Sequence, residues 1–365
     1  MLEQPLVHNI YSVQDLKLDA IDLLKKMIAI PSFSKDENAT ADLIENYLMQ
    51  HKIKTHRNTN NVWATNRYYN SDLPTILLNS HHDTVEPNSG YTLNPFEATE
   101  KEGKLFGLGS NDAGGALVSL LATFIYFYPQ KKLTYNLIFS ATAEEEISGI
   151  NGVSSILASL GQIDFAIVGE PTEMNLAIAE KGLLVLDCVA YGTSSHAAHS
   201  DPNNAIINAL ADVEWFNNFY FPKISEMLGE IKMNVTMIKA GTQHNVIPDR
   251  CEFTVDIRTT DVYDNREVLE IIEEHISSKV VPRSLRLNSS AIEILHPLVQ
   301  AGICLGRETY GSPTISDMAL MNFPSVKIGP GNSLRSHSSD EFIYINEIES
   351  GIDIYIQMLS KIIYL

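Results

Sequence analysis

Cysteine is scarce in this chain of 365 residues. The three cysteines, Cys188, Cys251 and Cys304, each lie in an apolar segment, and none belongs to a Cys-x-x-Cys pair. Their number and spacing therefore do not indicate a disulfide framework or a cysteine-based zinc site. We interpret all three as small core residues in a reducing compartment.

Basic residues are few relative to acidic ones. The chain has 26 Lys and Arg against 45 Asp and Glu, which gives a formal net charge of −19. Binding to a nucleic-acid backbone requires clustered basic side chains, so no nucleic-acid partner is expected. Bound cations would cancel part of this negative charge, and the rest would keep a solvated surface soluble.

Long apolar runs are also missing. The longest, residues 117–128, is too short to cross a bilayer. The first residues, MLEQPLVHNIYSVQD, do not combine a basic start with an apolar stretch as a secretory signal does. We therefore expect a cytoplasmic protein without a membrane partner.

The chain instead alternates short apolar runs with helical stretches. Its length suggests two domains, and 44% hydrophobic residues indicate a globular protein. Helices are expected at 13–30, 37–49, 113–128 and 154–160, and strands at 75–80, 135–141 and 165–169. This order predicts an α/β fold with a mostly parallel central sheet flanked by helices.

A different pattern begins after Lys181. Expected strands at 183–190, 233–239 and 251–258 and helices at 204–219 and 266–277 indicate an α+β module with an antiparallel sheet. From His296 the first pattern returns, with a helix through Leu305, a strand at 326–328 and a closing helix near 347–363. We therefore predict a discontinuous domain, 1–180 and 291–365, with a second domain inserted at 181–290.

Acidic and histidine residues follow the apolar runs of the first predicted domain. They are His81 and Asp83 in SHHDTV, Asp112 in GLGSNDAGG, Glu144-Glu145-Glu146 after YNLIFSATA, Glu170 in FAIVGEP, and His337 in GPGNSLRSHSSDEF. Burying unpaired carboxylates is costly, and a pair of divalent cations would compensate for it. Open α/β sheets bind ligands beyond the carboxyl ends of their strands, so the joint pattern predicts a two-metal hydrolase site.

Each motif also has a simpler explanation. His81 is followed two residues later by Asp83, so both can face one site and Asp83 can orient the imidazole. A histidine at a strand end is, however, more often an ordinary surface or core residue, and we assign His82 no role. Asp112 could simply cap the following helix, and a phosphate-binding loop is rejected because no Gly-Lys-[Ser/Thr] follows.

The glutamate run is the most informative motif, although a solvated loop would also explain it. Adjacent glutamates suit a site in which one carboxylate binds metal and its neighbour stays free as a general base. Arg335, close before His337, could meet a substrate carboxylate; the alternative is a solvent-facing arginine.

As a set, these motifs resemble a known family: the co-catalytic zinc amidohydrolases and exopeptidases that include acetylornithine deacetylase, succinyl-diaminopimelate desuccinylase, carboxypeptidase G and aminoacylase. The resemblance spans nearly the whole chain. Its motifs, in order, are SHHDTVEP, GLGSNDAGGAL, ATAEEEISGINGV, VGEPTE, EKG, SSHAAHSDPNNAI, NVIPDRCEFTVDIR and GPGNSLRSHSSDEF.

The resemblance implies a role for each candidate residue of the first domain. Asp112 would bridge two metal ions, His81 and Glu170 would complete one site, and Glu146 and His337 the other. Glu145 would be the general base, and Asp83 would orient His81. Zn²⁺ is the expected metal, and Co²⁺ or Mn²⁺ also suits nitrogen and oxygen ligands.

The inserted segment 181–290 resembles the family's lid, through which we expect a homodimer. His196 in SSHAAHS matches a histidine that reaches the neighbouring subunit's site to stabilise the oxyanion. Asn245 in NVIPD matches a residue that approaches substrate, and Arg258 in VDIR matches a lid arginine. Two positions depart from the family pattern: Gly114 stands where relatives often have Lys, and Ile315 where many have Thr.

The resemblance implies hydrolysis of the N-acyl amide of a small amino acid. N-acetylornithine, or N-acetyl- or N-succinyl-citrulline, in arginine biosynthesis is the preferred substrate. The INGV segment after the glutamate run resembles the desuccinylase pattern, which makes succinyl-diaminopimelate the first alternative and a dipeptide the next. An inactive binding protein of the same fold is disfavoured because neither Glu145 nor any ligand is missing.

Overall fold

The computed structural model describes residues 12–199 and 203–364, which divide into two compact units. The first unit comprises the described residues up to Ile178 together with 292–310 and 316–364, and the second comprises 179–291 and 311–315. The predicted insertion at 181–290 lies within the second unit. Residues 1–11, which bear on the secretory-signal argument, and residues 200–202 of the SSHAAHSDP motif lie outside the described part.

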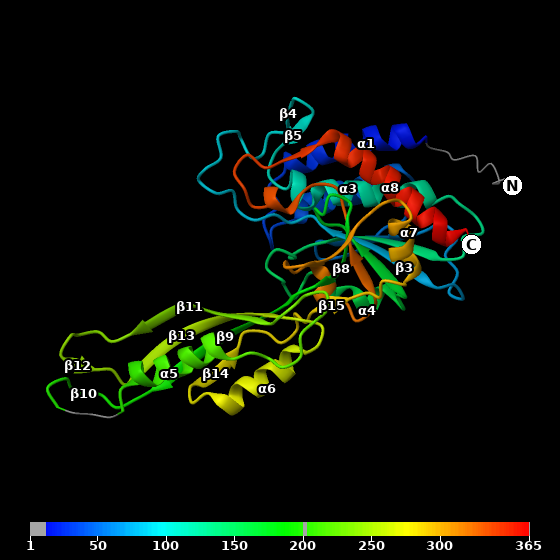
Figure 1. Cartoon of the computed structure of the whole chain (residues 1–365). Helices are drawn as coiled ribbons and strands as arrows, with labels where there is room; N and C mark the ends of the chain where they lie inside the picture. The colour runs from blue at the N-terminus through cyan, green and yellow to red at the C-terminus, as the bar shows by residue number, and fades with distance from the viewer. Residues whose placement is uncertain (1–11, 200–202, 365) are drawn as a thin grey trace. The chain divides into compact units, whose positions relative to one another are not determined.

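A mixed sheet forms the centre of the first unit (Figure 1). Its strands are β1 (His56–Asn58), β2 (Asn61–Thr65), β6 (Asn136–Thr142), β3 (Thr75–His81), β7 (Phe165–Val168), β17 (Ser325–Lys327) and β8 (Leu176–Glu180), named in spatial order. The four central strands, β6-β3-β7-β17, run parallel, whereas β2 and β8 flank them in antiparallel orientation. The predicted mostly parallel sheet is confirmed, and the antiparallel flanking strands were not foreseen.

Helices cover both faces of this sheet. They are α1 (Val13–Ile28), α2 (Asn38–Gln50), α3 (Gly115–Phe127), α4 (Leu157–Leu160), α7 (Pro297–Ile303) and α8 (Ile345–Ile363). Alternate residues of a strand point to opposite faces, so Ile76 and Leu78 of β3 join the larger apolar core with α1, α3 and α8. Leu77 joins a smaller core on the other face, near α4. Helices α1, α3 and α8 lie together in Figure 1.

Two predicted helices differ from the observed ones. The expected helix at 113–128 begins only at Gly115, after the π-helical turn η1 (Ser110–Gly114). Asp112 lies inside that turn with non-helical φ and ψ, and no side chain caps α3, so the explanation of Asp112 as a helix cap is wrong. The stretch at 154–160 forms the 3₁₀ turn η2 (Val153–Ser155) followed by α4.

A four-stranded antiparallel sheet forms the second unit. Its strands, in spatial order, are β11 (Lys232–Ala240), β13 (Arg250–Thr259), β9 (Gly182–Tyr191) and β14 (Lys279–Pro282). Buried and half-exposed residues alternate along β9, as expected for a sheet covered on one face. Helices α5 (Ala205–Asn218) and α6 (Asn265–His275) contribute Phe216 and Val268 to the core on that face.

The remaining strands are short. They are β10 (Ser195–His196) and β12 (Val246–Ile247), which pair with each other; β15 (Ser290–Ala291), which pairs with β8; β16 (Thr309–Ser312), which also pairs with β8; and the three-stranded sheet of β4 (Thr99–Lys101), β5 (Lys104–Phe106) and β18 (Phe342–Tyr344). The turns η3 (Asp317–Leu320) and η4 (Ser333–Arg335) complete the elements.

The cysteines and the helices bear on two further expectations. Cys188 and Cys251 are buried free thiols, as predicted. Cys304 is exposed, because it caps the carboxyl end of α7 at the surface, so the expectation of a core position is wrong there. Among the described residues, no helix combines the length and the apolar character needed to traverse a bilayer.

Candidate metal centre

The predicted site residues of the first unit gather at the carboxyl edge of the parallel strands. His81 is the last residue of β3, the glutamate run begins two residues after β6 ends at Thr142, and Glu170 follows β7, which ends at Val168. Parallel strands present their carboxyl ends at one edge of the sheet, where ligands bind in open α/β folds. Residues that end different strands, and are distant in sequence, therefore lie close together.

Two groups of side chains in the described residues have the composition and spacing of metal ligands. One consists of His81, Asp112 and Glu170, and the other of Asp112, Glu146 and His337; within each group the candidate ligand atoms lie within 4.8 Å of one another. Asp112 belongs to both groups. The structure thus brings together all five residues for which the family resemblance implies metal binding.

Asp112 presents a different oxygen to each group. Its Oδ1 lies 3.4 Å from His81 Nε2, and its Oδ2 lies 3.6 Å from His337 Nε2. His81 Nε2 is also 3.6 Å from Glu170 Oε1, while His337 Nε2 is 3.0 Å from Glu146 Oε2. One carboxylate placed between two imidazoles in this way has the geometry of a bridging ligand.

Asp83 fixes both His81 and the glutamate run. His81 Nδ1 lies 3.0 Å from the Asp83 carbonyl oxygen and 3.4 Å from its Oδ1. An N–H at Nδ1 leaves the lone pair of Nε2 directed at Asp112 and Glu170. The Asp83 carboxylate also accepts hydrogen bonds from the backbone N–H groups of Glu145 at 3.1 Å and Glu146 at 3.2 Å. Ser34 Oγ donates to it at 2.7 Å.

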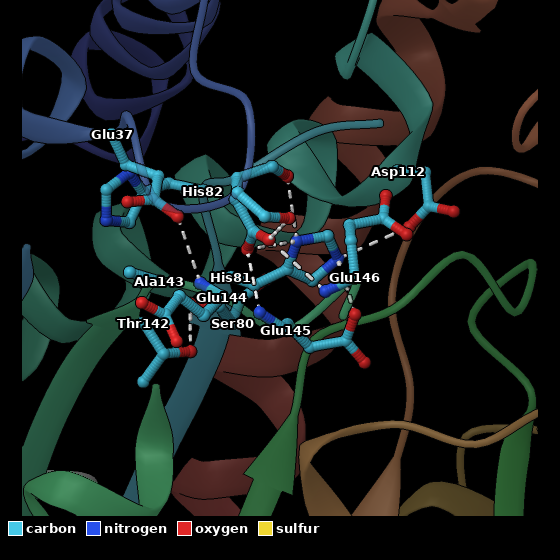
Figure 2. A network of polar contacts seen from close by, with 12 residues as sticks. Glu37, Ser80, His81, His82, Asp112, Thr142, Ala143, Glu144, Glu145 and Glu146 are labelled. Atoms are coloured by element: carbon cyan, nitrogen blue, oxygen red, sulfur yellow. Dashed lines mark hydrogen bonds and ion pairs between the residues drawn. The ribbon is translucent and has the colours of Figure 1, made fainter. Parts of the chain in front are cut away.

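The three successive glutamates have different surroundings. Glu144 is buried and turned back on its own loop, where its carboxylate accepts hydrogen bonds from the N–H and side-chain amide of Asn151. Its N–H donates to Glu37 Oε1 at 3.2 Å. Glu145 faces His81 instead (Figure 2), with its Oε2 3.9 Å from His81 Nε2, and Glu146 faces His337, with its Oε2 3.0 Å from His337 Nε2. The alternative of a solvated loop is therefore wrong.

Negative charge is concentrated and buried here. Burial raises the pKa of Glu145 well above its usual value, and the charges of Glu170 and Asp317 raise it further. Burial likewise raises the pKa of Glu170 to about 8. Burial opposes protonation of His81, but the surrounding carboxylates, Glu145 foremost, raise its pKa well above the usual value.

These shifts mean that protons or cations must compensate the buried carboxylates. The hydrogen bond with Glu146 similarly raises the pKa of His337 to about 9. Imidazole nitrogens and carboxylate oxygens in groups of three, sharing one carboxylate, are ligands that suit Zn²⁺, Co²⁺ or Mn²⁺. The residues present therefore fit a pair of divalent cations.

His82, to which the sequence assigned no role, points away from the site. Its Nδ1 lies 2.9 Å from Thr40 Oγ1, and its Nε2 lies 2.9 Å from the Asn60 carbonyl oxygen. Burial lowers its pKa to about 4. Figure 2 shows His82 beside Glu37, away from Asp112. It is a neutral core histidine.

The sequence analysis missed two buried carboxylates near the site. Asp317 Oδ2 accepts hydrogen bonds from Asn79 Nδ2 at 2.8 Å and Thr142 Oγ1 at 2.7 Å, and so joins the ends of β3 and β6. Glu341 accepts hydrogen bonds from three backbone N–H groups of the loop that carries Asp112. Asp317 lies two residues after Ile315, and Glu341 lies in the motif GPGNSLRSHSSDEF, but no local spacing distinguishes either from a surface acid.

The remaining candidate residues lie elsewhere. Arg335 donates two hydrogen bonds to Glu347, at 2.7 and 2.9 Å, and packs over Phe342 and Tyr344. The solvent-facing alternative is therefore wrong, and a role for Arg335 in substrate binding would require this ion pair to open. Arg258, on β13 of the second unit, is likewise paired with Asp256.

His196 and Asn245 lie together in the second unit, at the antiparallel pair formed by β10 and β12. His196 is paired with Val246 across the two strands, and the Asn245 carbonyl oxygen accepts a hydrogen bond from Ala197 N at 3.0 Å. His196 is exposed, and its Nδ1 accepts a hydrogen bond from Ala198 N at 3.0 Å. In that tautomer the proton is on Nε2, which is available as a donor.

Comparisons with known proteins agree with this geometry. The sequence model of a family described as Peptidase family M20/M25/M40 matches residues 77–361. A succinyl-diaminopimelate desuccinylase from Buchnera aphidicola subsp. Cinara cedri is 26% identical, covering 94% of this chain and 99% of the relative. An acetylornithine deacetylase from Buchnera aphidicola subsp. Acyrthosiphon pisum is 25% identical, covering 94% and 98%.

A solved structure shares the fold. It is a Bacillus subtilis protein described as a dinuclear metal-binding peptidase of the M20 family, which matches with a TM-score of 0.70 at 18% identity over 96% of this chain and 98% of its own. The family resemblance and the fold class predicted from the sequence are confirmed by these matches.

Asp317 provides a test of the buried charge. Burial raises its pKa to about 6, whereas the pKa in the unfolded chain is near 4. Ionisation of Asp317 therefore lowers the stability of the folded protein. This loss is absent below about pH 4 and complete above about pH 6. Asp317→Asn keeps an acceptor oxygen for Asn79 and Thr142 but carries no charge. We expect Asp317→Asn to be more stable than the natural protein when a chelator keeps both free of metal. The difference in their free energies of unfolding, measured with urea, should increase by on the order of 1–2 kcal/mol from pH 4.5 to 7.

The matched control is Asp317→Ala, which removes the acceptor and leaves both buried donors unpaired. It lacks the charge as well, so it should be less stable than Asp317→Asn by about 1–3 kcal/mol at each pH. A stability difference for Asp317→Asn that does not change with pH would show that the pKa of Asp317 is not raised in the folded protein.

Proposed function

From the premise that the chain belongs to peptidase family M20/M25/M40 and is a hydrolase, we propose that it is a two-metal amidohydrolase that cleaves the N-acyl amide of a small amino acid. The observation that carries this proposal is the pair of ligand groups that share Asp112, with the carboxylate of Glu145 beside them and outside both groups. A free carboxylate next to the ligands has a use in hydrolysis and none in metal storage or in an inactive binding protein.

In this proposal His81, Asp112 and Glu170 hold one divalent ion, and Asp112, Glu146 and His337 hold the other. Zn²⁺ is the expected metal. When bound, such a pair lowers the pKa of a water molecule toward about 7 and polarises the amide carbonyl. Asp83 keeps His81 in the tautomer that offers Nε2.

Glu145 is the proposed general base. Its backbone N–H is held by Asp83, so the carboxylate is directed at the ligand groups by a fixed peptide and not by a mobile loop. Glu145 takes a proton from the attacking water and delivers it to the departing amine. The raised pKa that burial gives Glu145 suits a group that must hold a proton between these two steps.

We also propose that the second unit is a lid and dimerisation domain, which supplies His196 to the partner subunit's site. The neutral His196 tautomer offers an Nε2–H donor, the kind of group that stabilises an oxyanion. Support for dimerisation comes from β11, an edge strand with Met237 and Ile238 exposed, and from Ile207 and Leu210 exposed on α5. Exposed apolar side chains on an edge strand and helix favour pairing with a second copy.

Two substrates are supported by the relatives. One named relative is a succinyl-diaminopimelate desuccinylase and another an acetylornithine deacetylase, at nearly the same identity. We propose acylated ornithine or citrulline first, in arginine biosynthesis in the cytoplasm, with succinyl-diaminopimelate as the second candidate. In both, the bond cleaved is an amide between a small acyl group and an amino acid, which the same site can hydrolyse. A role for Asn245 and Arg258 near the substrate remains part of this proposal.

Substitution of Glu145 and Glu146 tests which of the two is the general base and which binds metal. Glu145→Ala should keep both metal ions and lower kcat by about 10²–10⁴-fold, because only proton transfer is lost. Glu146→Ala should lose one of the two ions. Metal content by elemental analysis and initial rates measure both effects. The reverse pattern, with an ion lost from Glu145→Ala alone, would exchange the two roles.

Mixed dimers test the sharing of His196. His196→Ala and Glu145→Ala proteins should each be nearly inactive, but subunit exchange should restore about a quarter of the natural activity, because half of the dimers then contain one complete site. The natural protein subjected to the same exchange is the control. Absence of any recovery in verified mixed dimers would contradict a site built from both subunits.

Amine release from a matched panel tests the substrate. With Zn²⁺ or Co²⁺ present, we expect hydrolysis of N-acetylornithine, N-acetylcitrulline or N-succinylcitrulline in preference to N-succinyl-diaminopimelate and a dipeptide. Preference for N-succinyl-diaminopimelate would support the proposed amide hydrolysis but contradict the proposed role in arginine biosynthesis. If the protein binds two ions but hydrolyses none of these compounds, the hypothesis of an inactive binding protein is favoured.

A further inference from the structure

Two segments that are more than two hundred residues apart are joined at the candidate metal centre. One is the loop 107–112, which carries Asp112, and the other is the segment 332–341, which carries His337. Asn111 forms one link, since its Nδ2 donates to the Asn332 carbonyl oxygen at 3.1 Å and its Oδ1 accepts from Asn332 N at 3.0 Å. Glu341 forms the other.

The Glu341 side chain is almost completely buried and accepts only from the Asp112 loop in the hydrogen bonds that the structure describes. Its Oε1 accepts from Asn111 N at 2.8 Å and Asp112 N at 2.9 Å, and its Oε2 accepts from Gly109 N at 3.1 Å. The carbonyl oxygen of Glu341 accepts from Gly107 N at 3.0 Å as well. The peptide that carries Asp112 is therefore held by Glu341.

The same segment is fixed at His337, four residues earlier. The His337 carbonyl oxygen accepts from Asn88 Nδ2 at 3.2 Å. Asp340 accepts from Thr92 N at 2.8 Å and Leu93 N at 2.9 Å, which attaches the segment to a neighbouring loop. Because Glu341 belongs to this fixed segment, its bonds to the Asp112 loop set how far Asp112 lies from His337.

We propose that Glu341 is a positioning residue that sets the spacing of Asp112 and His337 and thereby the affinity for the ion held by Asp112, Glu146 and His337. This inference rests on the proposed two-metal function. Glu341 itself belongs to neither ligand group. The ion held by His81, Asp112 and Glu170 depends less on Glu341, because only one of its ligands lies on the two joined segments.

Glu341→Gln tests this role with little change in shape. One oxygen of the amide can still accept from Asn111 and Asp112, but the NH₂ group would face the Gly109 N–H, so donor would meet donor. The loop should then shift. Asp340→Asn is the matched control, because it makes the same substitution one residue away, and there the amide NH₂ can donate to Thr92 Oγ1.

The experiment titrates each metal-free protein with Zn²⁺ by calorimetry and repeats it with Co²⁺ to follow the visible spectrum of each bound ion. The natural protein and Asp340→Asn should bind two ions alike. Glu341→Gln should bind the first ion within about 3-fold of the natural affinity and the second about 10–100-fold more weakly, with a changed Co²⁺ spectrum for that ion. Glu341→Asp, which keeps the charge at shorter reach, should recover part of this loss.

The outcomes separate this inference from the proposed function. Two ions bound by Glu341→Gln with natural affinities, or both weakened equally, would overturn the positioning role while leaving the two-metal site in place. A natural protein that binds fewer than two ions would overturn the proposed function and this inference with it. If Glu341→Gln does not fold, selective weakening of one ion in Glu341→Asp supports the inference, and natural affinities in Glu341→Asp overturn it.

Discussion

Buried negative charge at the carboxyl edge of the parallel sheet is the constraint on which the rest of the site depends. Asp83, Asp112, Glu145 and Glu170 all lie close to the completely buried imidazole of His81. Unpaired charge in a low-dielectric interior is costly, and the raised pKa of Glu170 expresses that cost directly. Divalent cations would remove most of it, so in this protein metal binding and folding of the edge loops are expected to be linked.

A second set of carboxylates holds the backbone instead of facing the ions. Glu37 accepts from the N–H of Glu144, Asp83 from the N–H groups of Glu145 and Glu146, and Glu341 from the loop around Asp112. Charge-assisted hydrogen bonds of this kind are stronger than neutral ones. Part of the excess of acidic residues is therefore buried. These carboxylates hold the loops of the site, although composition alone would assign them to the solvated surface.

The second unit combines a closed apolar core with an exposed edge strand. Its core under β9 is closed by α5 and α6, yet β11 is an edge strand and the paired strands β10 and β12 carry His196 at an exposed position. The proposed dimerisation would use this apolar edge.

The sequence by itself determined the helices and strands with strong periodicity and the residues that end the parallel strands. His81, Asp112, Glu146, Glu170 and His337 were identifiable because each follows a local apolar run and together they match an ordered set of motifs. The expected helix at 113–128 and the core position of Cys304 were wrong in detail, because a π-helical turn and a helix end are decided by contacts outside the segment.

Only the tertiary structure decided what the remaining acids do. Glu144 resembles its two neighbours in sequence but is turned away by Glu37 and Asn151, and Arg335 is held by Glu347. Asp317 and Glu341 acquire their roles from donors more than 170 residues away, since Asp317 meets Thr142 and Glu341 meets Asp112. A carboxylate carries no local mark of such a partner, because hydrogen-bond donors are supplied by whichever backbone the fold places beside it.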